Sequence, residues 1–486
     1  MRLLAALVAL ACATAAAGSP AEAQEPQKVP APAATAPEIE AAVRALVSDR
    51  AFKDAKVGIS IVDVESGRVL AASGEHVPLN PASNAKVYTA AAALATLRGD
   101  FRYETTLSGV LKSGEVTGAL VLRGSGDPSL QTSDLVRMVD DLRGLGVRRV
   151  ADGIAVDQRA FDGEFVPPAF EQQPNEWASF RSPVAAVSLN ENTVTMTVRP
   201  QGEGAPALVV FDPPGFVDVE GAITTAGEGA DGVGLVLVPT GKRLQAKVSG
   251  KVGADARVVR FTRRVDDPSL LAGYALKVAL EQAGIKVGGE VKAGHGKGPV
   301  LARHVSEPLS SLLYAVGKNS DNFYAEMIFK TLGGETKRRP ARHADAAETV
   351  KSWLEKVGAF EAGMVVKNGS GLFDANRATA SSMTTALRAV YKDPALQTEF
   401  VAQLAVGGAD GTLKKRFTAE RARRNVRAKT GTLEDAIALS GYVLGPEGKG
   451  PIAFSVLMNG TAGHAAQARA AIDKLVLMLA RRSWPR

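Results

Sequence analysis

The sequence predicts an α+β protein in which one sandwich is split by a long β-rich insertion. Segments with strand-like alternation and segments with helical periodicity lie near both ends of the 486-residue chain. Between them, from about residue 105 to residue 299, short β-like runs are punctuated by Gly and Pro. No internal repeat with a fixed period is found, so we do not expect a repeat array.

The first 23 residues have the composition of a signal peptide. Arg2 forms a short basic region, an Ala- and Leu-rich run follows to about residue 17, and Ala21-Glu22-Ala23 resembles a cleavage site. The mature chain would begin near Gln24, and its Pro- and Ala-rich start, to residue 37, is expected to be a tether. We therefore expect an exported protein, periplasmic or otherwise extracytoplasmic.

Cysteine content and charge narrow the function classes. Cys12 is the only cysteine and lies within the predicted signal peptide, so the mature chain would have no disulfide and no catalytic thiol. Lipid attachment at Cys12 is the alternative. No later run reaches the roughly 18 apolar residues of a membrane span. The net charge of +7 is spread along a chain with 5% aromatic residues, which argues against nucleic-acid binding. A basic exported protein can associate with anionic envelope polymers, although a solvated surface explains the same charge.

The first part of the sandwich is predicted to start with a strand pair. Residues 57–64 alternate and are rich in β-branched side chains, residues 65–67 form a turn, and residues 68–73 continue as a second strand. An Ala-rich helix is expected over residues 84–97, after Pro81. Ser83 then lies at a helix N-terminus, and Lys86 lies one turn away on the same face.

The remaining elements follow from periodicity and composition. In the insertion we expect strands over residues 103–111, 118–124, 153–157, 193–198, 207–211, 234–238 and 256–265, with helices over 133–145 and 268–283. Beyond it we expect helices over 310–317, 322–332, 382–392 and 464–482, and strands over 438–444 and 452–458. The last helix is expected to cover a sheet; its basic end and apolar stripe leave a membrane-surface helix as the alternative.

Three short motifs follow one another along the chain: Ser83-Asn84-Ala85-Lys86, Ser320-Asp321-Asn322 and Lys429-Thr430-Gly431. They match the S-x-x-K, S-D-N and K-T-G set of active-site serine enzymes that process D-alanyl peptides or β-lactams. Lys112-Ser113-Gly114 resembles the third motif but comes too early in the chain, and we expect it to form a hairpin turn.

The residue types in these motifs suit acyl transfer. Serine is a weak nucleophile until a neighbouring base takes its proton, and Lys86 stands three residues after Ser83. A lysine acts as a base only when its pKa falls well below roughly 10.4, which burial and a nearby cation achieve. We expect Lys429 to be that cation. The helix N-terminus at Ser83 directs N–H groups toward developing negative charge.

The other two motifs are expected to bind and relay. The hydroxyl of Ser320 is placed to pass a proton to a leaving amine, and the amide of Asn322 to hydrogen-bond a peptide. Lys429 and Thr430, on a strand edge, suit a terminal carboxylate. Gly431 is expected to let the substrate backbone approach closely. No H-E-x-x-H is present and the five histidines are scattered, so we expect no metal and no cofactor.

The chain resembles the class C low-molecular-mass penicillin-binding proteins, the exported D-alanyl-D-alanine carboxypeptidase/endopeptidase family. The resemblance spans nearly the whole mature chain and rests on the three motifs together with residues 124–130, 188–192, 320–326, 369–372, 376–377 and 408–413. It implies a serine β-lactamase/transpeptidase-like sandwich, formed by residues 24–105 and 300–486. It also implies that residues 106–299 form two inserted β-rich subdomains.

The resemblance also implies roles for individual residues. Ser83 would be acylated with Lys86 as its base, Ser320 would shuttle protons, and Asn322 would hold the substrate backbone. Lys429 and Thr430 would bind the terminal carboxylate, and the N–H groups of Ser83 and Thr432 would form the oxyanion hole. The substrates would be peptidoglycan stem peptides and cross-links, and β-lactams would trap the same serine.

Four further positions extend the resemblance or depart from it. Asp157 and Phe161 fit a position in the insertion that faces the cleft in the family. Asp374 and Glu434 stand where members that recognise a diaminopimelate stem often have a basic or amide side chain. Because an anion repels a carboxylate, we hypothesise a preference for an amidated or cationic substrate end.

Two alternative functions remain open at the level of sequence. One is a β-lactamase or esterase on the same fold, although no E-x-x-L-N follows the first motif and Ser-Asp-Asn replaces the Tyr-x-Asn of another lactamase class. The other is a non-catalytic peptidoglycan-binding scaffold, against which the intact set of motif residues argues. No oligomeric state is predicted.

Overall fold

The computed structural model describes residues 36–446 and 449–483. The predicted signal peptide, Cys12 and nearly all of the predicted tether lie outside these residues. From Thr35 onward the chain forms one compact unit, so the division at residues 105 and 299 remains a prediction. No helix of the described residues combines the length and the apolar character that crossing a membrane requires.

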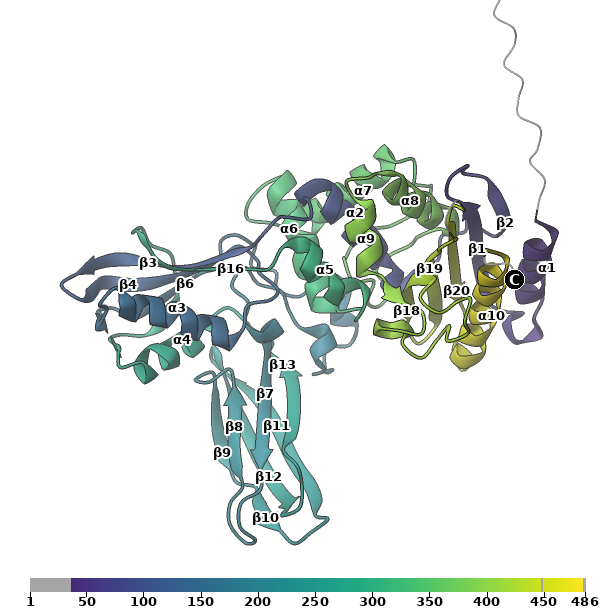
Figure 1. The fold of residues 1–486 in the computed structure, drawn as a ribbon. Helices are drawn as coiled ribbons and strands as arrows, with labels where there is room; N and C mark the ends of the chain where they lie inside the picture. Colours follow the sequence, from purple (N-terminus) through teal and green to yellow (C-terminus); the bar gives the residue numbers. More distant parts are fainter. Residues whose placement is uncertain (1–35, 447–448, 484–486) are drawn as a thin grey trace, which may run out of the picture. The chain divides into compact units, whose positions relative to one another are not determined.

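A six-stranded antiparallel sheet joins the two ends of the chain (Figure 1). Its strand order is β17-β18-β19-β20-β1-β2, and β1 pairs with β20 from Lys56↔Asn459 to Asp63↔Ile452. The strands are β1 (Lys56–Asp63), β2 (Val69–Ser73), β17 (Ala405–Val406), β18 (Val426–Thr432), β19 (Ala436–Val443) and β20 (Ile452–Asn459). This pairing confirms the strands predicted over residues 57–64, 68–73, 438–444 and 452–458.

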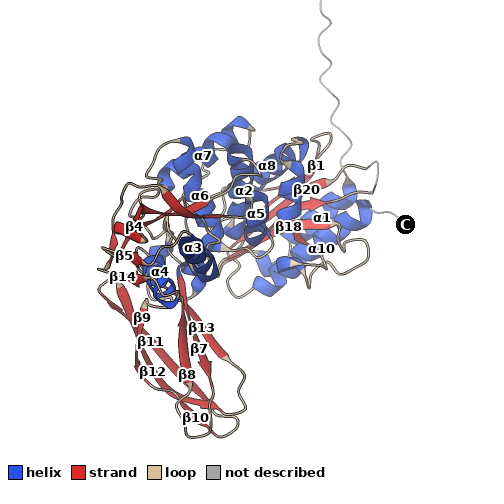
Figure 2. Ribbon diagram, turned by 60° about the vertical axis from the view of Figure 1, so that its left-hand side comes forward, coloured by secondary structure: helices blue, strands red, loops and turns tan. Residues whose placement is uncertain are grey.

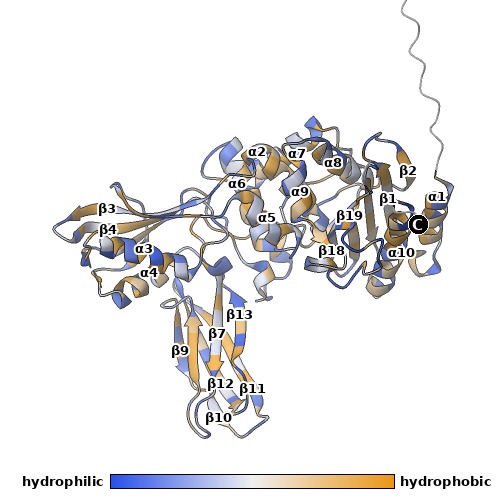
Figure 3. Cartoon of the chain, viewed as in Figure 1, coloured by the Kyte–Doolittle hydropathy of each residue, from blue (hydrophilic) through white to orange (hydrophobic). Residues whose placement is uncertain are grey.

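Helices cover both faces of this sheet (Figure 2). Alternate residues of β19 separate the two layers: Ile437 and Leu439 pack in the core with α1 and α10, whereas Ala438 packs in the core with the other helices. Figure 3 shows that the central strands are predominantly hydrophobic, as strands buried on both faces should be. The first layer consists of α1 (Pro37–Val47) and α10 (Ala465–Ser483), and the second of α2 (Ala85–Leu97), α5 (Leu309–Gly317), α6 (Asn322–Thr336), α7 (His343–Lys356), α8 (Ala380–Lys392) and α9 (Gln397–Gln403).

These layers confirm the predicted fold class and the prediction that the last helix covers a sheet. No element was predicted at α1, α7 or α9, and the helix predicted over residues 322–332 extends to Thr336. The helix continues through Gly333, where the start of α7 packs closely against it. A side chain at Gly333 would lie 2.7 Å from the carbonyl oxygen of Arg342, so only glycine permits this packing.

The insertion contains three sheets around one hydrophobic core. A seven-stranded sheet comprises β3 (Glu104–Lys112), β4 (Glu115–Gly124), β5 (Arg149–Val150), β6 (Ile154–Asp157), β14 (Lys286–Val287), β15 (Val291–Ala293) and β16 (Val300–Val305), and the helices of the insertion are α3 (Thr132–Gly144) and α4 (Leu271–Gln282). The other sheets comprise β7 (Thr193–Arg199), β8 (Leu208–Asp212) and β13 (Val259–Arg264), and then β9 (Val217–Gly221), β10 (Thr224–Ala226), β11 (Asp231–Thr240) and β12 (Arg243–Gly253).

The early K-[ST]-G string forms the expected hairpin turn. Lys112 pairs with Glu115 across β3 and β4, and Ser113 and Gly114 between them have φ values of 48° and 83°. Two successive positive φ angles are typical of the tight turn that joins antiparallel strands. The seven-stranded sheet also includes β16, which pairs with β3 although β16 begins at Val300, just beyond the predicted end of the insertion.

Candidate active site

Ser83 lies in a short 3₁₀ turn (Ala82–Asn84) that leads directly into α2. Two backbone positions at the site are strained. Ala82 has a φ of 46° and Ser320 a φ of 62°, a region that non-glycine residues occupy at a cost of order 1–3 kcal/mol. Such strain is retained when the surrounding structure fixes it, and here it falls on Ser320 and on the residue before Ser83.

Lys86 connects the first two motifs. Its Nζ atom donates hydrogen bonds to Ser83 Oγ at 3.0 Å, to Asn322 Oδ1 at 2.7 Å and to the carbonyl oxygen of Ser370 at 2.7 Å. A neutral amine has two N–H donors and one lone pair. With the donors on Asn322 and Ser370, the lone pair of a neutral Lys86 faces the Ser83 hydroxyl.

Burial makes the neutral form of Lys86 accessible. The side chain is 1% exposed, and this burial lowers the pKa of Lys86 to about 7, against the opposing influence of the Glu326 and Asp321 carboxylates. Removal from water, one of the two expected causes, is the dominant one. Burial likewise lowers the pKa of Lys429 well below its usual range, and the charge of Lys86 lowers it further.

The second motif starts α6. Asp321 caps the helix by accepting a 2.8 Å hydrogen bond from the backbone N–H of Tyr324, and Ser320 precedes it. Asn322 is the first residue of α6 and reaches Lys86, while its Nδ2 donates to the carbonyl oxygen of Phe180 in the insertion at 3.0 Å. A peptide carbonyl that binds this amide would therefore take the place of Phe180.

The third motif lies on β18, as expected for a strand-edge site. Lys429 Nζ donates to Ser320 Oγ at 2.7 Å and to the carbonyl oxygen of Thr430 at 2.8 Å, and Thr430 Oγ1 donates to Thr412 Oγ1 at 3.0 Å. Gly431 permits a close approach, but to the chain itself: a side chain there would lie 2.9 Å from the carbonyl oxygen of Pro81. Glycine thus lets β18 pack against the segment that carries Ser83.

A cavity of about 750 Å³ opens over these residues. Ser83, Ser320, Asn322 and Thr432 line it, together with both acidic residues singled out in the sequence, Asp374 and Glu434. The buried amines of Lys86 and Lys429 lie beneath it, in contact with the two serines. The cavity therefore presents two serine hydroxyls, each in contact with a buried lysine amine.

Several lining residues had no predicted role. Gln172, Gln173 and Phe180 come from the insertion, and nothing local in the sequence marks them, since the fold alone brings the insertion to the cleft. Phe373 and Arg377 come from the segment after Gly371, in which Asn376-Arg377 is one of the strings that carry the family resemblance. Arg377 Nη1 donates to Asp374 Oδ1 at 2.6 Å, and this hydrogen bond lowers the pKa of Asp374.

Asp157 and Phe161 do not line the cavity. Asp157 ends β6 and accepts hydrogen bonds from Arg123 and Arg159 in a different pocket. Phe161 is buried among the side chains of a small core that includes Phe323 of α6. The expectation that both residues face the cleft is therefore wrong in this structure. β6 pairs with β4 so that Asp157 lies opposite Arg123 and binds it. Phe161 is buried because it packs against α6.

Comparison with known proteins places this site in a family. Residues 39–482 match the D-Ala-D-Ala carboxypeptidase 3 (S13) family. The chain is 34% identical over 442 residues to a D-alanyl-D-alanine carboxypeptidase of Actinomadura sp., an alignment that covers 87% of this chain and 81% of that protein. Penicillin binding protein 4 (dacB) from Haemophilus influenzae has the same fold, with a TM-score of 0.74 at 24% identity over 90% of this chain and 98% of the other.

A second structure of the H. influenzae protein, complexed with a novel β-lactam, aligns with a TM-score of 0.71 at 23% identity over the same shares of the two chains. The family match covers nearly all of the described residues, including the three motifs and the insertion. The chain therefore belongs to the D-Ala-D-Ala carboxypeptidase 3 (S13) family.

Proposed function

We propose that the chain hydrolyses D-Ala–D-Ala bonds and D-centred cross-links of peptidoglycan stem peptides through a Ser83 acyl-enzyme. The observation that carries this proposal is the contact of Lys86 Nζ with both Ser83 and Asn322. It unites the nucleophile, a base of lowered pKa and a substrate-binding amide. Family membership supplies the reaction class.

In the proposed reaction, Lys86 takes the Ser83 proton while Ser83 Oγ attacks the carbonyl carbon of the scissile peptide bond. The C–N bond breaks, and the leaving amine receives a proton through Ser320, whose Oγ accepts a hydrogen bond from Lys429. The proton passed on through Ser320 is the one that Lys86 took from Ser83, so Lys86 is neutral again. Water then attacks the ester carbonyl, Lys86 takes a proton from this water and gives it to Ser83 Oγ as the ester C–O bond breaks, and Ser83 is regenerated. Thr430 and Thr432 are proposed to bind the terminal carboxylate with Lys429, and the N–H groups of Ser83 and Thr432 to stabilise the oxyanion.

β-Lactams are proposed to acylate the same serine, consistent with the β-lactam complex of the H. influenzae relative. We further propose that the protein is exported, because its reaction requires access to the cell wall and residues 1–23 resemble a signal peptide.

The test is an intact-mass measurement of the mature protein after incubation with a fluorescent penicillin, beside Ser83→Ala. We expect one adduct per chain in the parent and none in the variant. Turnover of a soluble pentapeptide ending in D-Ala-D-Ala should be lost in the same variant. A parent that forms no adduct and turns over no peptide would contradict the proposal and favour the peptidoglycan-binding scaffold.

A further inference from the structure

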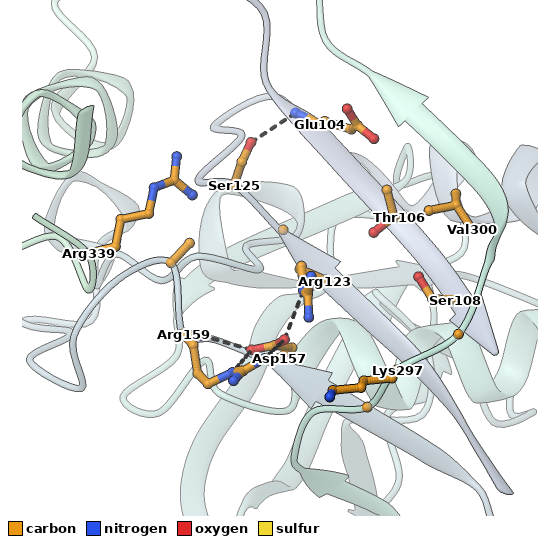
Figure 4. A pocket seen from close by; sticks show the side chains of 14 residues that line it. Glu104, Thr106, Ser108, Arg123, Ser125, Asp157, Arg159, Lys297, Val300 and Arg339 are labelled. Atoms are coloured by element: carbon orange, nitrogen blue, oxygen red, sulfur yellow. Dashed lines mark hydrogen bonds and ion pairs between the residues drawn. The ribbon is translucent and has the colours of Figure 1, made fainter.

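A second pocket lies in the insertion, separate from the catalytic cavity (Figure 4). It has a volume of about 670 Å³ and is formed by β3, β4, the end of β6, the segment 296–300 and Arg339. It shares no lining residue with the cavity that contains Ser83.

A buried carboxylate organises the cations of this pocket. The Asp157 side chain is 2% exposed and accepts hydrogen bonds from Arg123 Nε and from Arg159 Nε and Nη2, all at 2.9 Å. Burial raises the pKa of Asp157, but the hydrogen bonds from the two arginines outweigh it and hold the pKa at about 2. The two arginine side chains remain 52% and 59% exposed, so their outer N–H groups stay accessible.

The pocket carries uncompensated positive charge. Lys297 is exposed and, within the described residues, makes no ion pair or hydrogen bond, and Figure 4 shows its side chain in the same pocket as Asp157 and the two arginines. Three cations thus surround one carboxylate. The remaining charges of the wall are already paired, Glu104 with Arg303 and Arg339 with Glu335.

The position of Lys297 is fixed by the glycines on either side. A side chain at Gly296 would lie 2.8 Å from Val121 Cγ2, and one at Gly298 would lie 2.9 Å from the backbone of Gly109. Glycine at both places lets this segment lie directly against the sheet. Residues 296–298 therefore pack against the sheet, and this packing places Lys297 at the pocket.

The polar lining suits a carboxylate on a peptide. The hydroxyls of Thr106 and Ser108 share the wall with the cations. Arginine N–H groups bind a carboxylate in a two-pronged geometry, and hydroxyls suit amide groups beside it.

The location of the pocket suggests a second segment of a polymeric substrate. Arg339 pairs with Glu335, which lies 13 residues after Asn322 on α6, or about 20 Å along the helix axis at 1.5 Å per residue. A stem peptide of about five residues extends at most about 17 Å. Asn322 at the catalytic cavity and Glu335 beside the wall of the second pocket are thus farther apart along α6 than one stem peptide extends, which favours a second stem as the ligand of this pocket.

Resting on the proposed function, we propose that the Arg123–Arg159–Lys297 pocket binds a carboxylate of a second stem peptide in the peptidoglycan polymer. This contact anchors the polymer while another stem occupies the catalytic cavity. A soluble pentapeptide does not use it.

The test compares Lys297→Glu and Arg159→Gln with Lys292→Glu, which makes the same charge change as the first variant on an exposed site of β15 in the same sheet. Binding is measured in a Ser83→Ala background by cosedimentation with purified peptidoglycan freed of attached phosphate polymers. We expect Lys297→Glu to weaken binding about fivefold, the size of one exposed charge contact. Lys292→Glu should bind like its parent.

Two further measurements identify the ligand and separate this proposal from the catalytic one. Converting the polymer carboxylates to amides should abolish the difference between Lys297→Glu and its parent. With Ser83 intact, all three variants should retain the parent kcat/KM for the soluble pentapeptide; a parent that is inactive on it would refute the proposed function instead. Equal binding of Lys297→Glu and Lys292→Glu, or a difference that appears only with phosphate-bearing polymer, would overturn the anchoring proposal.

Discussion

Glu326 accepts a 2.7 Å hydrogen bond from the backbone N–H of Ser370, and the carbonyl oxygen of Ser370 in turn accepts a hydrogen bond from Lys86. Glu326 also accepts from the N–H of Gly369 at 3.1 Å, and its side chain is fully buried. This carboxylate therefore positions Lys86 through the backbone of the 369–370 segment, and its charge raises the pKa of that lysine.

We predict that Glu326→Gln shifts the acid limb of the acylation rate to lower pH. Without the carboxylate, the protonated form of Lys86 loses stabilisation, so the pKa of Lys86 falls further. Glutamine also keeps only one acceptor oxygen for the N–H groups of Gly369 and Ser370, so the segment that holds Lys86 is positioned less well. The maximal rate should therefore fall about tenfold, which corresponds to roughly 1.4 kcal/mol of lost transition-state stabilisation. Glu355→Gln, at an exposed site on α7, is the control and should show neither change. An unchanged pH profile for Glu326→Gln would refute the positioning role.

The pH dependence of the parent enzyme follows from Lys86. The proposed base acts in its neutral form, and the pKa of Lys86 is about 7, so acylation by a fluorescent penicillin should be slow at pH 5 and half-maximal near pH 7. The rate rises with pH because deprotonation produces the active form. Stopped-flow acylation between pH 5 and pH 9 measures this limb, and a rate that still rises about tenfold per pH unit from pH 8 to pH 9 would show that burial does not lower the pKa of Lys86.

Gly431→Ala should reduce activity more than stability. The added methyl group would lie 2.9 Å from the carbonyl oxygen of Pro81 and 3.1 Å from Ala82 Cβ, which displaces the segment that carries Ser83. Overpacking of this kind costs about 1–3 kcal/mol, and a 1 Å displacement of a reacting group can cost about 100-fold in rate. Gly163→Ala, where a side chain meets open space, is the matched control. Full acylation activity in Gly431→Ala would contradict the proposed close packing.

The buried ion pair between Lys330 and Asp162 should be important for stability. Lys330 lies on α6 with a fully buried side chain, and its Nζ contacts Asp162 Oδ1 at 2.5 Å and donates to the carbonyl oxygen of Glu164 at 2.8 Å. Removal of one member of such a pair costs about 3–5 kcal/mol. We therefore expect Lys330→Met to lower the urea midpoint strongly.

Two comparison variants complete that experiment. Adding Asp162→Asn to Lys330→Met should recover part of the lost stability, because it removes the unpaired charge. Lys337→Met, at an exposed position just after α6, should leave the midpoint within error. A Lys330→Met protein as stable as Lys337→Met would show that the ion pair contributes nothing to folding.

Asp374 and Glu434 in the cavity wall predict a preference for stem peptides whose side-chain carboxylate is amidated. Arg377 pairs with Asp374, whereas Glu434 is exposed in the cavity wall and makes no ion pair within the described residues. Glu434→Gln should therefore raise kcat/KM for a stem peptide with a free side-chain carboxylate about fivefold relative to its amidated form, the size of one exposed charge contact. Glu420→Gln, exposed outside the cavity, is the control. A parent enzyme that clearly prefers the free acid would contradict the hypothesis.

Local patterns in the sequence were sufficient for many elements. The alternating run at residues 57–64 and the apolar run at residues 452–458 became paired strands, and Ser113-Gly114 formed a tight turn with two positive φ angles, of which only that of Gly114 is free of strain. β12 was not predicted, although Leu244, Ala246 and Val248 alternate with polar residues and face the core. α7 was not predicted either, although its buried side chains recur at helical spacing. α9 has only seven residues, which is too few to show a clear helical period.

The sequence by itself determined the order of the three motifs, the place of Ser83 before a helix and the spacing of Ser83 and Lys86, since these depend on neighbouring residues. Only the tertiary structure decided how the motifs meet. Lys86 contacts Asn322 across 236 residues and Lys429 contacts Ser320 across 109. The tertiary structure also decided that burial lowers the pKa of Lys86 and that Asp157 belongs to a second pocket. The physical reason is that removal from water and contacts between distant segments exist only once the chain has packed around its cores.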